Sequence, residues 1–332
     1  MDLTTNYMGL KLKNPILPGA GPMVDDLSMV RRLEDAGAPA IVMHSLFEEQ
    51  IVGEQLANYT ATELPKEYYA EALSYLPEPE GFHLGPDEYL DQIGKIKKAV
   101  SVPVIASLNG STTGGWLDYA KLIAEAGADA LELNVYDLSI DPAPGMRDAQ
   151  VIELRTIDMV RLVSGAVKIP VAVKLSPFYT SMGHFAGQLA KNGAKGLVMF
   201  NRLYQPDIDV ELLEMKRTNP VGLGDLNLRL RWLGILYGQT GASLAASGGI
   251  TTANEVVKAI MAGADVTQMV SALLLNGPEY LATVRKKFEQ WMEEKEYVSL
   301  SDLRGSMSMS KCPDPMAYQR ANYMRTLMSW RM

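Results

Sequence analysis

Most of the short apolar segments of the chain lead into a polar or very small residue, and these residues are the candidates for chemistry. Asn and Ser also cap helices and Gly also turns the chain, so any one position has an ordinary structural explanation. Several of them at one edge of a sheet would form a polar site large enough for an extended ligand. The positions are Gly19-Ala20-Gly21, His44-Ser45, Ser107 with Asn109, Asn134, Lys174, Asn201, Ser247-Gly248-Gly249 and Ser271.

Lys174 ends one of these segments, in the apolar run Val171–Leu175. An isolated ammonium group is costly to bury at the inner end of a strand, so we expect it to have a partner. It could neutralise the negative charge that develops on a reduced flavin, form a Schiff base with a carbonyl substrate, or belong to a purely structural ion pair. Because Val173 and Leu175 would remain, we expect Lys174→Ala to harm such chemistry more than folding.

Two adjacent glycines, Gly248 and Gly249, precede a helix that we expect to begin near Ala253. Glycine lets backbone N–H groups approach a phosphate closely, and a helix N-terminus favours an anion. In a barrel, Ser271 after the next segment would complete the phosphate site, while a tight turn without a ligand is the alternative. No GxGxxG dinucleotide fingerprint follows the first strand.

An internal repeat indicates which elements position these residues. Four segments read as a helix end, a glycine that can take a positive φ, and a short apolar strand, namely Glu34–Met43, Ala124–Leu133, Ala190–Met199 and Ile260–Met269. The sequence predicts eight strands in all, at 15–20, 40–44, 103–107, 130–134, 170–174, 196–200, 243–247 and 266–270, with amphipathic helical patterns between most of them. This alternation favours an α/β fold of the (β/α)8 TIM barrel type over an open doubly wound sheet. Active-site residues of such barrels come from the carboxyl ends of the strands.

Two stretches fall outside the repeating units. Residues 46–88 form a long loop after the second strand, on the side of the active site, where it could be a lid or have only packing duties. We expect residues 1–296 to form the barrel and residues 297–332 a Met-rich helical extension. In the extension, Asp314-Pro315 would start a helix whose face with Met324 and Met328 packs on the barrel or on a second subunit.

Composition excludes several classes of protein. Apolar residues make up 47% of the 332 residues, and no apolar run approaches the ~20 residues of a membrane span. A net charge of −8 argues against a general affinity for nucleic acid. Cys312 is the single cysteine, and His44, His83 and His184 lack metal-ligand spacing, so we expect no disulfide, no iron–sulfur cluster and no metal site. With no signal peptide visible, we expect a cytoplasmic protein.

Over roughly residues 1–290 the chain resembles the dihydroorotate dehydrogenases, which are FMN-dependent (β/α)8 barrels of pyrimidine biosynthesis. The matching motifs are Leu12-Lys13-Asn14-Pro15 through Ala20-Gly21, Ser107-Leu108-Asn109-Gly110, Leu131-Glu132-Leu133-Asn134, Val173-Lys174, Phe200-Asn201, Ser247-Gly248-Gly249-Ile250 and Ser271-Ala272. The resemblance implies an FMN-dependent oxidoreductase that converts dihydroorotate to orotate.

The resemblance also implies roles for single residues. Ala20, Gly21 and Ser45 would lie against the isoalloxazine, and Asn109 would also bind the cofactor. Asn134 and Asn201 would be amides shared by flavin and substrate, with Lys174 near flavin N1 and O2. Gly248, Gly249 and Ser271 would hold the phosphate.

The departures from the family pattern fall on the substrate side. The family has Lys-Ser where this chain has His44-Ser45, and it has a Cys or Ser base where this chain has Asp137. Its Asn-x-Met-Gly-Leu-Pro-Asn segment is replaced by Leu76–His83. Asp137 is our candidate base, with Tyr136 and His44 as alternatives, and we assign His44 to substrate binding.

Three other functions remain open: a flavoprotein of this family with a different substrate, a flavoprotein without turnover, and a Schiff-base aldolase that uses Lys174. A colourless protein would favour the aldolase, and a yellow one a flavoprotein. A separate electron-transfer partner and a homodimer are compatible with the sequence.

Overall fold

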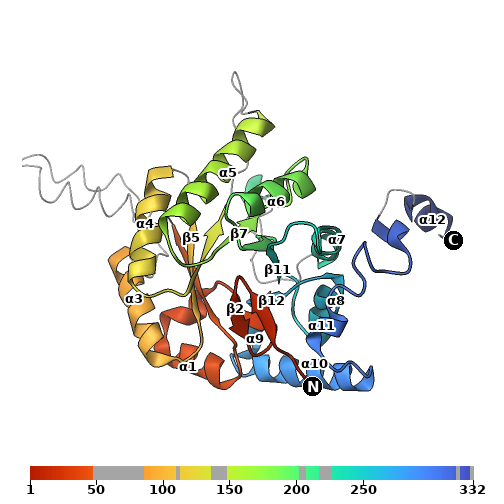
Figure 1. The fold of residues 1–332 in the computed structure, drawn as a ribbon, viewed down its shortest axis with the longest axis horizontal. Helices are drawn as coiled ribbons and strands as arrows, with labels where there is room; N and C mark the ends of the chain where they lie inside the picture. Colours follow the sequence, from red (N-terminus) through yellow and green to blue (C-terminus); the bar gives the residue numbers. More distant parts are fainter. Residues whose placement is uncertain are drawn as a thin grey trace, which may run out of the picture.

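A barrel of parallel strands forms the core of the protein (Figure 1). The computed structural model describes residues 1–47, 86–109, 113–135, 148–201, 207–216, 226–318 and 322–329. The eight-stranded sheet runs in the order β3(Ile16–Pro18), β12(Val266–Met269), β11(Ser243–Ser247), β8(Gly196–Met199), β7(Val171–Leu175), β6(Ala130–Asn134), β5(Val104–Asn109) and β4(Ile41–Phe47). The two edge strands, β3 and β4, lie beside each other, so the sheet nearly closes. The predicted TIM barrel is confirmed.

Helices alternate with the strands and cover the outside of the barrel (Figure 1). In each repeat the helix ends at a glycine of positive φ, namely Gly37, Gly127, Gly193 and Gly263, at +96°, +100°, +113° and +128°. This conformation stops a helix and lets the chain enter the next strand, as the repeat predicted. The helices are α1(Leu27–Asp35), α3(Pro86–Ala99), α4(Thr113–Glu125), α5(Ala149–Ala166), α6(Met182–Lys191), α7(Leu226–Leu236), α8(Ala253–Ala262), α9(Ser271–Asn276) and α10(Tyr280–Glu294).

An N-terminal hairpin closes the amino-terminal end of the barrel. Strands β1(Thr5–Tyr7) and β2(Leu10–Leu12) pair in antiparallel fashion. Tyr7 and Met8 of this hairpin are buried in one apolar cluster with small barrel residues such as Ala172. Small inward-facing residues thus leave room that the hairpin fills, and apolar side chains close this end. The opposite, carboxyl end is left for a polar site.

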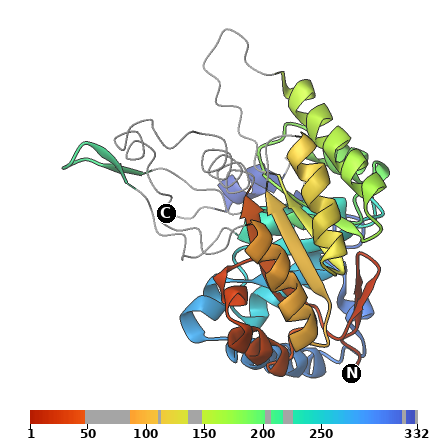
Figure 2. The ribbon, with the colours of Figure 1, turned by 90° about the vertical axis from the view of Figure 1, so that its left-hand side faces the viewer.

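A second hairpin follows β8 and was not predicted from the sequence. It consists of β9(Asp207–Asp209) and β10(Glu214–Lys216), and it stands away from the barrel (Figure 2). Most of the long loop predicted after the second strand, residues 48–85, lies outside the described residues. In the part of the chain that the structure describes, no helix is long and apolar enough to cross a membrane.

The C-terminal extension begins by bonding to the rest of the chain. Asp2 N donates to Val298 O at 3.1 Å, next to the short helix α11(Leu300–Leu303). Gly305 N then donates to Ile260 O on α8 at 2.9 Å. The domain boundary at residue 297 stays a prediction.

The end of the chain differs from the single helix expected after Asp314-Pro315. A 3-10 helix, η3(Pro315–Tyr318), begins at the expected residue, and α12(Asn322–Met328) is a separate element. A 3-10 turn advances three residues per turn instead of 3.6, so one apolar stripe does not run through both elements. Met324 and Met328 are 57% and 80% exposed, so their face does not pack on the barrel.

Arg304 ties the extension to the barrel through an ion pair with Asp265, whose carboxylate also accepts the backbone N–H of Leu244 at 2.7 Å. Burial raises the pKa of Asp265 above 3.8, and the charge of Arg304 opposes that rise. We expect Arg304→Met to lower the free energy of unfolding by about 2 kcal/mol at neutral pH, because it leaves a buried carboxylate without its cation.

The sign of the pH dependence follows from the raised pKa. The folded protein binds the Asp265 proton more tightly than the unfolded chain, so this carboxyl favours folding below its ordinary pKa and loses that contribution as the pH rises through the raised value. The deficit of Arg304→Met should therefore shrink when denaturation is measured near pH ~4. Arg325→Met is the matched control, since its ion pair with Asp314 is 62% and 54% exposed and should contribute less than about 1 kcal/mol. A deficit that does not change with pH would contradict this explanation.

Candidate active site

The polar residues that follow the strands gather at the carboxyl end of the barrel, because the eight strands are parallel. Asp137, the candidate base, lies outside the described residues, as do Tyr136 and Leu76–His83. The structure describes the other residues that the sequence singled out, which are Ala20, Gly21, His44, Ser45, Asn109, Asn134, Lys174, Asn201, Gly248, Gly249 and Ser271.

Four side chains form a hydrogen-bonded line across this end of the barrel. The Oγ atoms of Ser107 and Ser45 are 2.8 Å apart, and Asn134 Nδ2 donates to Ser45 Oγ at 3.3 Å. Asn201 Nδ2 donates to Asn134 Oδ1 at 2.5 Å. An amide has two N–H donors, so each asparagine keeps one beyond these bonds. The structure therefore brings together the two amides that the resemblance assigns to flavin and substrate.

Lys174 has a buried carboxylate partner that the sequence analysis did not identify. Lys174 Nζ donates to Glu132 Oε1 at 3.1 Å, and Gln268 Nε2 donates to Glu132 Oε2 at 2.7 Å. The side chains of Lys174 and Glu132 are 7% and 1% exposed. Lys174 is also in register with Asn134 on the neighbouring strand. The ion pair thus holds the ammonium group inside the barrel, next to the line of amides.

A bulge in β4 gives His44 its position. The pairing with β5 passes from Val42 opposite Ile105 to Ser45 opposite Ser107, so β4 has one residue more than β5 over this stretch. Such a bulge bends the strand and re-aims its side chains. Because of the extra residue, Ser45 and not His44 is paired with Ser107.

His44 lies against a carboxylate and a buried tyrosine. Its Nδ1 is 2.8 Å from Oδ1 of Asp25, the last residue of the 3-10 helix η1(Pro22–Asp25). Its ring meets that of Tyr89 on α3 edge to face, with centroids 5.2 Å apart. Tyr89 Oη donates to His44 O at 3.0 Å, and burial raises the pKa of this phenol, which keeps it neutral. Where the resembled family has a lysine, this chain therefore has a histidine beside an acid.

Gly248 and Gly249 form the turn after β11. Their φ angles are +88° and +76°, a region that side chains rarely tolerate. A Cβ on Gly248 would also lie only 2.7 Å from Nη2 of Arg229. Ser247 is in register with Gln268, so Ser271 follows the neighbouring strand at the same end of the barrel. Gly248, Gly249 and Ser271 therefore lie at one end of the barrel, with Arg229 packed against the backbone of Gly248.

The N-terminus of α8, near which the sequence analysis expected a phosphate, has side-chain caps of its own. The helix begins at Ala253 as expected, but its own side chains cap it: Thr252 Oγ accepts from Asn254 N at 3.2 Å, and Glu255 Oε2 accepts from Thr252 N at 2.6 Å. Burial opposes ionisation of Glu255, but hydrogen bonds from Thr252 and Thr251 outweigh it and lower its pKa. A phosphate placed at this helix end would therefore lie near the Glu255 carboxylate, and the phosphate site stays a prediction.

Gly19 and Gly21 let the end of β3 pack closely on the residue after β12. A Cβ at Gly19 would lie 2.9 Å from Val270 Cγ2, and one at Gly21 would lie 3.0 Å from Val270 Cγ1. Ala20 between them is half-buried. Three small residues in a row present backbone instead of bulky side chains, which is compatible with a flat ring lying over them.

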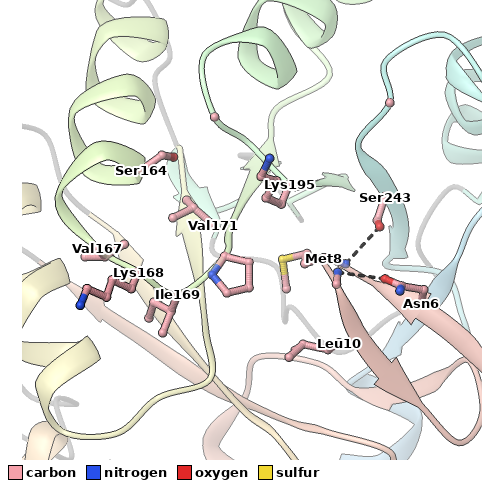
Figure 3. Close-up of a pocket in the computed structure, with 14 residues that line it drawn as sticks. Asn6, Met8, Leu10, Ser164, Val167, Lys168, Ile169, Val171, Lys195 and Ser243 are labelled. Atoms are coloured by element: carbon pink, nitrogen blue, oxygen red, sulfur yellow. Dashed lines mark hydrogen bonds between the residues drawn. The ribbon is translucent and has the colours of Figure 1, made fainter.

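A cavity of about 580 Å³ lies at the other end of the barrel, between the N-terminal hairpin and the segments that precede β7, β8 and β11 (Figure 3). Its walls include Met8, whose N–H donates to Ser243 Oγ at 3.1 Å, together with Lys168 and Lys195. None of the candidate site residues lines it. Within the described ranges, no group of three His, Cys, Asp or Glu side chains could hold a metal ion.

The sequence held a usable signal for one of the site residues that the sequence analysis did not identify. Inward-facing residues of a strand recur every second position. Asn134 was placed inside, so Glu132 on the same strand should have been placed there too. Asp25 and Arg229 carry no such signal, because their positions depend on how η1 and α7 pack.

The sequence is similar to a known protein family and to named proteins over most of its length. The model of the dihydroorotate dehydrogenase family matches residues 2–292. A protein from Thermoplasma acidophilum named dihydroorotate dehydrogenase B (NAD(+)), catalytic subunit, is 27% identical over 317 residues, which are 92% of this chain and 98% of that protein. Proteins of the same name from Methanocaldococcus jannaschii and Pyrococcus abyssi are 27% and 28% identical, each over 91% of this chain and over 97% and 98% of their own lengths.

Proposed function

Because the chain belongs to the dihydroorotate dehydrogenase family, whose members are oxidoreductases that act on a CH–CH bond, we propose that it binds FMN and oxidises dihydroorotate to orotate. The observation that carries this proposal is the line Ser45–Asn134–Asn201 with the buried ammonium of Lys174 in register beside it. Amide groups and one fixed cation in a closed apolar barrel suit a planar ligand that gains negative charge.

FMN, when bound, supplies a ring that accepts a hydride from a substrate carbon. Ala20, Gly21, Ser45 and Asn109 would hold this ring. Lys174 places a positive charge where negative charge develops. Gly248, Gly249 and Ser271 would hold the phosphate and so help to orient the cofactor.

Oxidation of a CH–CH bond also removes a proton from the adjacent carbon, and a side chain must take it. Asp137 stands in the place of the family base, and we assign this role to it. Asn134 and Asn201 orient the substrate through the amide N–H groups that do not take part in the hydrogen bonds described above. The reaction balances because one hydride and one proton leave the substrate and a C=C bond forms between the two carbons.

His44 favours a second candidate function, that of a flavoprotein of the same family with a different substrate. In the resembled enzymes this position offers a permanent cation, whereas here the imidazole already faces the Asp25 carboxylate at 2.8 Å. A substrate without a carboxylate would suit this side of the pocket equally well. A Schiff-base aldolase is disfavoured, because Lys174 Nζ is engaged by Glu132 Oε1 at 3.1 Å inside the barrel and is not available to attack a carbonyl substrate.

We also propose that electrons leave through a separate partner protein, since the similar proteins are named as catalytic subunits. We further propose that the protein forms a homodimer and is located in the cytoplasm.

Identification of the bound chromophore tests the cofactor assignment. The purified protein should be yellow, and the flavin released on denaturation should migrate with FMN. Recovery of FAD, or no flavin uptake after incubation with excess FMN, would contradict the assignment.

A further inference from the structure

We propose that Gln268 is a positioning residue, which holds the Glu132 carboxylate against the ammonium group of Lys174 and so sets how strongly this cation stabilises negative charge on a bound flavin. This inference rests on the proposed function and deepens it. Gln268 belongs to none of the motifs that carry the family resemblance.

Gln268 reaches the ion pair from the opposite side of the barrel interior. It lies on β12, four strands away in the sheet from β6, which carries Glu132. Both side chains belong to residues that are 1% exposed. Gln268 Nε2 donates to Glu132 Oε2 at 2.7 Å, while Lys174 Nζ donates to the other oxygen, Oε1, at 3.1 Å. The amide and the ammonium group thus share one carboxylate.

The amide of Gln268 is oriented to suit both charges. Within the described residues, it is the donor that satisfies Glu132 Oε2, and a buried carboxylate oxygen without a donor would be costly. Its own oxygen, Oε1, lies at the longer distance of 3.5 Å from Lys174 Nζ. The N–H side of the amide therefore faces the anion and its oxygen faces the cation. Bonds at both oxygens fix the direction of the Glu132 carboxylate, and through it the place of the ammonium group.

The same amide adjoins the segment where we expect the flavin ring. A Cβ built on Gly19 would lie 3.1 Å from Gln268 Cβ and 3.6 Å from Gln268 Oε1. Gly19 directly precedes Ala20 and Gly21, which we assign to the ring. Charges interact strongly inside an apolar barrel. If Gln268 no longer holds the carboxylate, the ammonium group is free to move, and negative charge on the ring loses part of its stabilisation.

The first test needs no flavin. Because hydrogen bonds to charged groups are roughly twice as strong as those between neutral groups, Gln268→Met should lower the melting temperature of the flavin-free parent about twice as much as that of a Lys174→Met/Glu132→Gln variant. Gln268→Asn withdraws the amide by one methylene group and covers the case in which Gln268→Met does not fold. Thr267→Val is the matched control, since it removes a buried bond to Pro15 O at 3.3 Å on the same strand. Its loss should be equal in both backgrounds.

The second test measures the midpoint potential of bound FMN by equilibration with a reference dye and a chemical reductant. We expect Gln268→Met to make two-electron reduction about tenfold less favourable, which corresponds to a potential about 30 mV lower. Its affinity for oxidised FMN should stay within about threefold of the parent. Thr267→Val should leave the potential unchanged. The measurement does not depend on dihydroorotate as the substrate.

Equal losses of melting temperature in the two backgrounds would show that Gln268 does not act through the ion pair. An unchanged or raised potential would show that it supports only the fold, and either result overturns the proposal. If the parent chain binds no flavin, the proposed function fails, and the melting temperatures alone decide whether Gln268 positions the ion pair: a larger loss in the parent supports this, and equal losses overturn it.

Discussion

Lys174→Met should slow reduction of the bound flavin by about 10²- to 10³-fold, because it removes the fixed cation that stabilises the developing negative charge. The same change should lower the free energy of unfolding by roughly 3–5 kcal/mol, because it leaves the Glu132 carboxylate buried without its cation. Stopped-flow absorbance and denaturant titration measure the two effects separately. The sequence-based prediction that removing this lysine harms the chemistry more than folding did not include Glu132, whose buried carboxylate adds a cost to folding.

A double variant separates chemistry from stability. Lys174→Met combined with Glu132→Gln removes both charges and keeps an amide that can bond to Gln268. It should recover most of the lost stability while flavin reduction stays slow. A double variant that reduces flavin as fast as the parent would show that Lys174 has no role beyond its ion pair.

Gly248→Ala should abolish measurable FMN binding, because the new Cβ would lie 2.7 Å from Arg229 Nη2 and the residue would also be held at a φ of +88°. Gly238→Ala is the matched control. Gly238 has a similar φ of +75°, but a Cβ there would meet nothing within 4 Å. Both variants should lose about 1 kcal/mol of stability from the backbone strain alone.

Only the first variant should lose the cofactor, which isothermal titration with FMN would measure. Equal effects of the two substitutions on FMN affinity would show that backbone strain, and not the contact with Arg229, makes glycine necessary at this turn.

The barrel could be predicted because its signals are local and repeated. Each repeat combines a helix end, a glycine of positive φ and an apolar strand, so the eight strands were placed close to their observed positions. The positions of Ser45, Asn134, Lys174 and Asn201 followed from the rule that parallel strands end at one edge.

The partners of these residues were harder to predict, because they come from elements far away in the sequence. Asp25 reaches His44 only because η1 packs beside a bulge in β4, and a bulge leaves no periodic signal. Arg229 reaches Gly248 across the packing of α7 on β11. The capping of α8 by Glu255 could have been predicted from the Thr252–Glu255 spacing. Instead, the neighbouring glycine pair led to the prediction of a phosphate at this helix end.

The most direct test of the account is anaerobic addition of dihydroorotate to the purified flavoprotein, followed by absorbance of the oxidised flavin and by analysis of the product. The account predicts that one equivalent of dihydroorotate bleaches the flavin and that orotate appears in equal amount. A bound FMN that dithionite reduces but excess dihydroorotate leaves oxidised would contradict it, and would assign the pocket beside His44 and Asp25 to a different substrate.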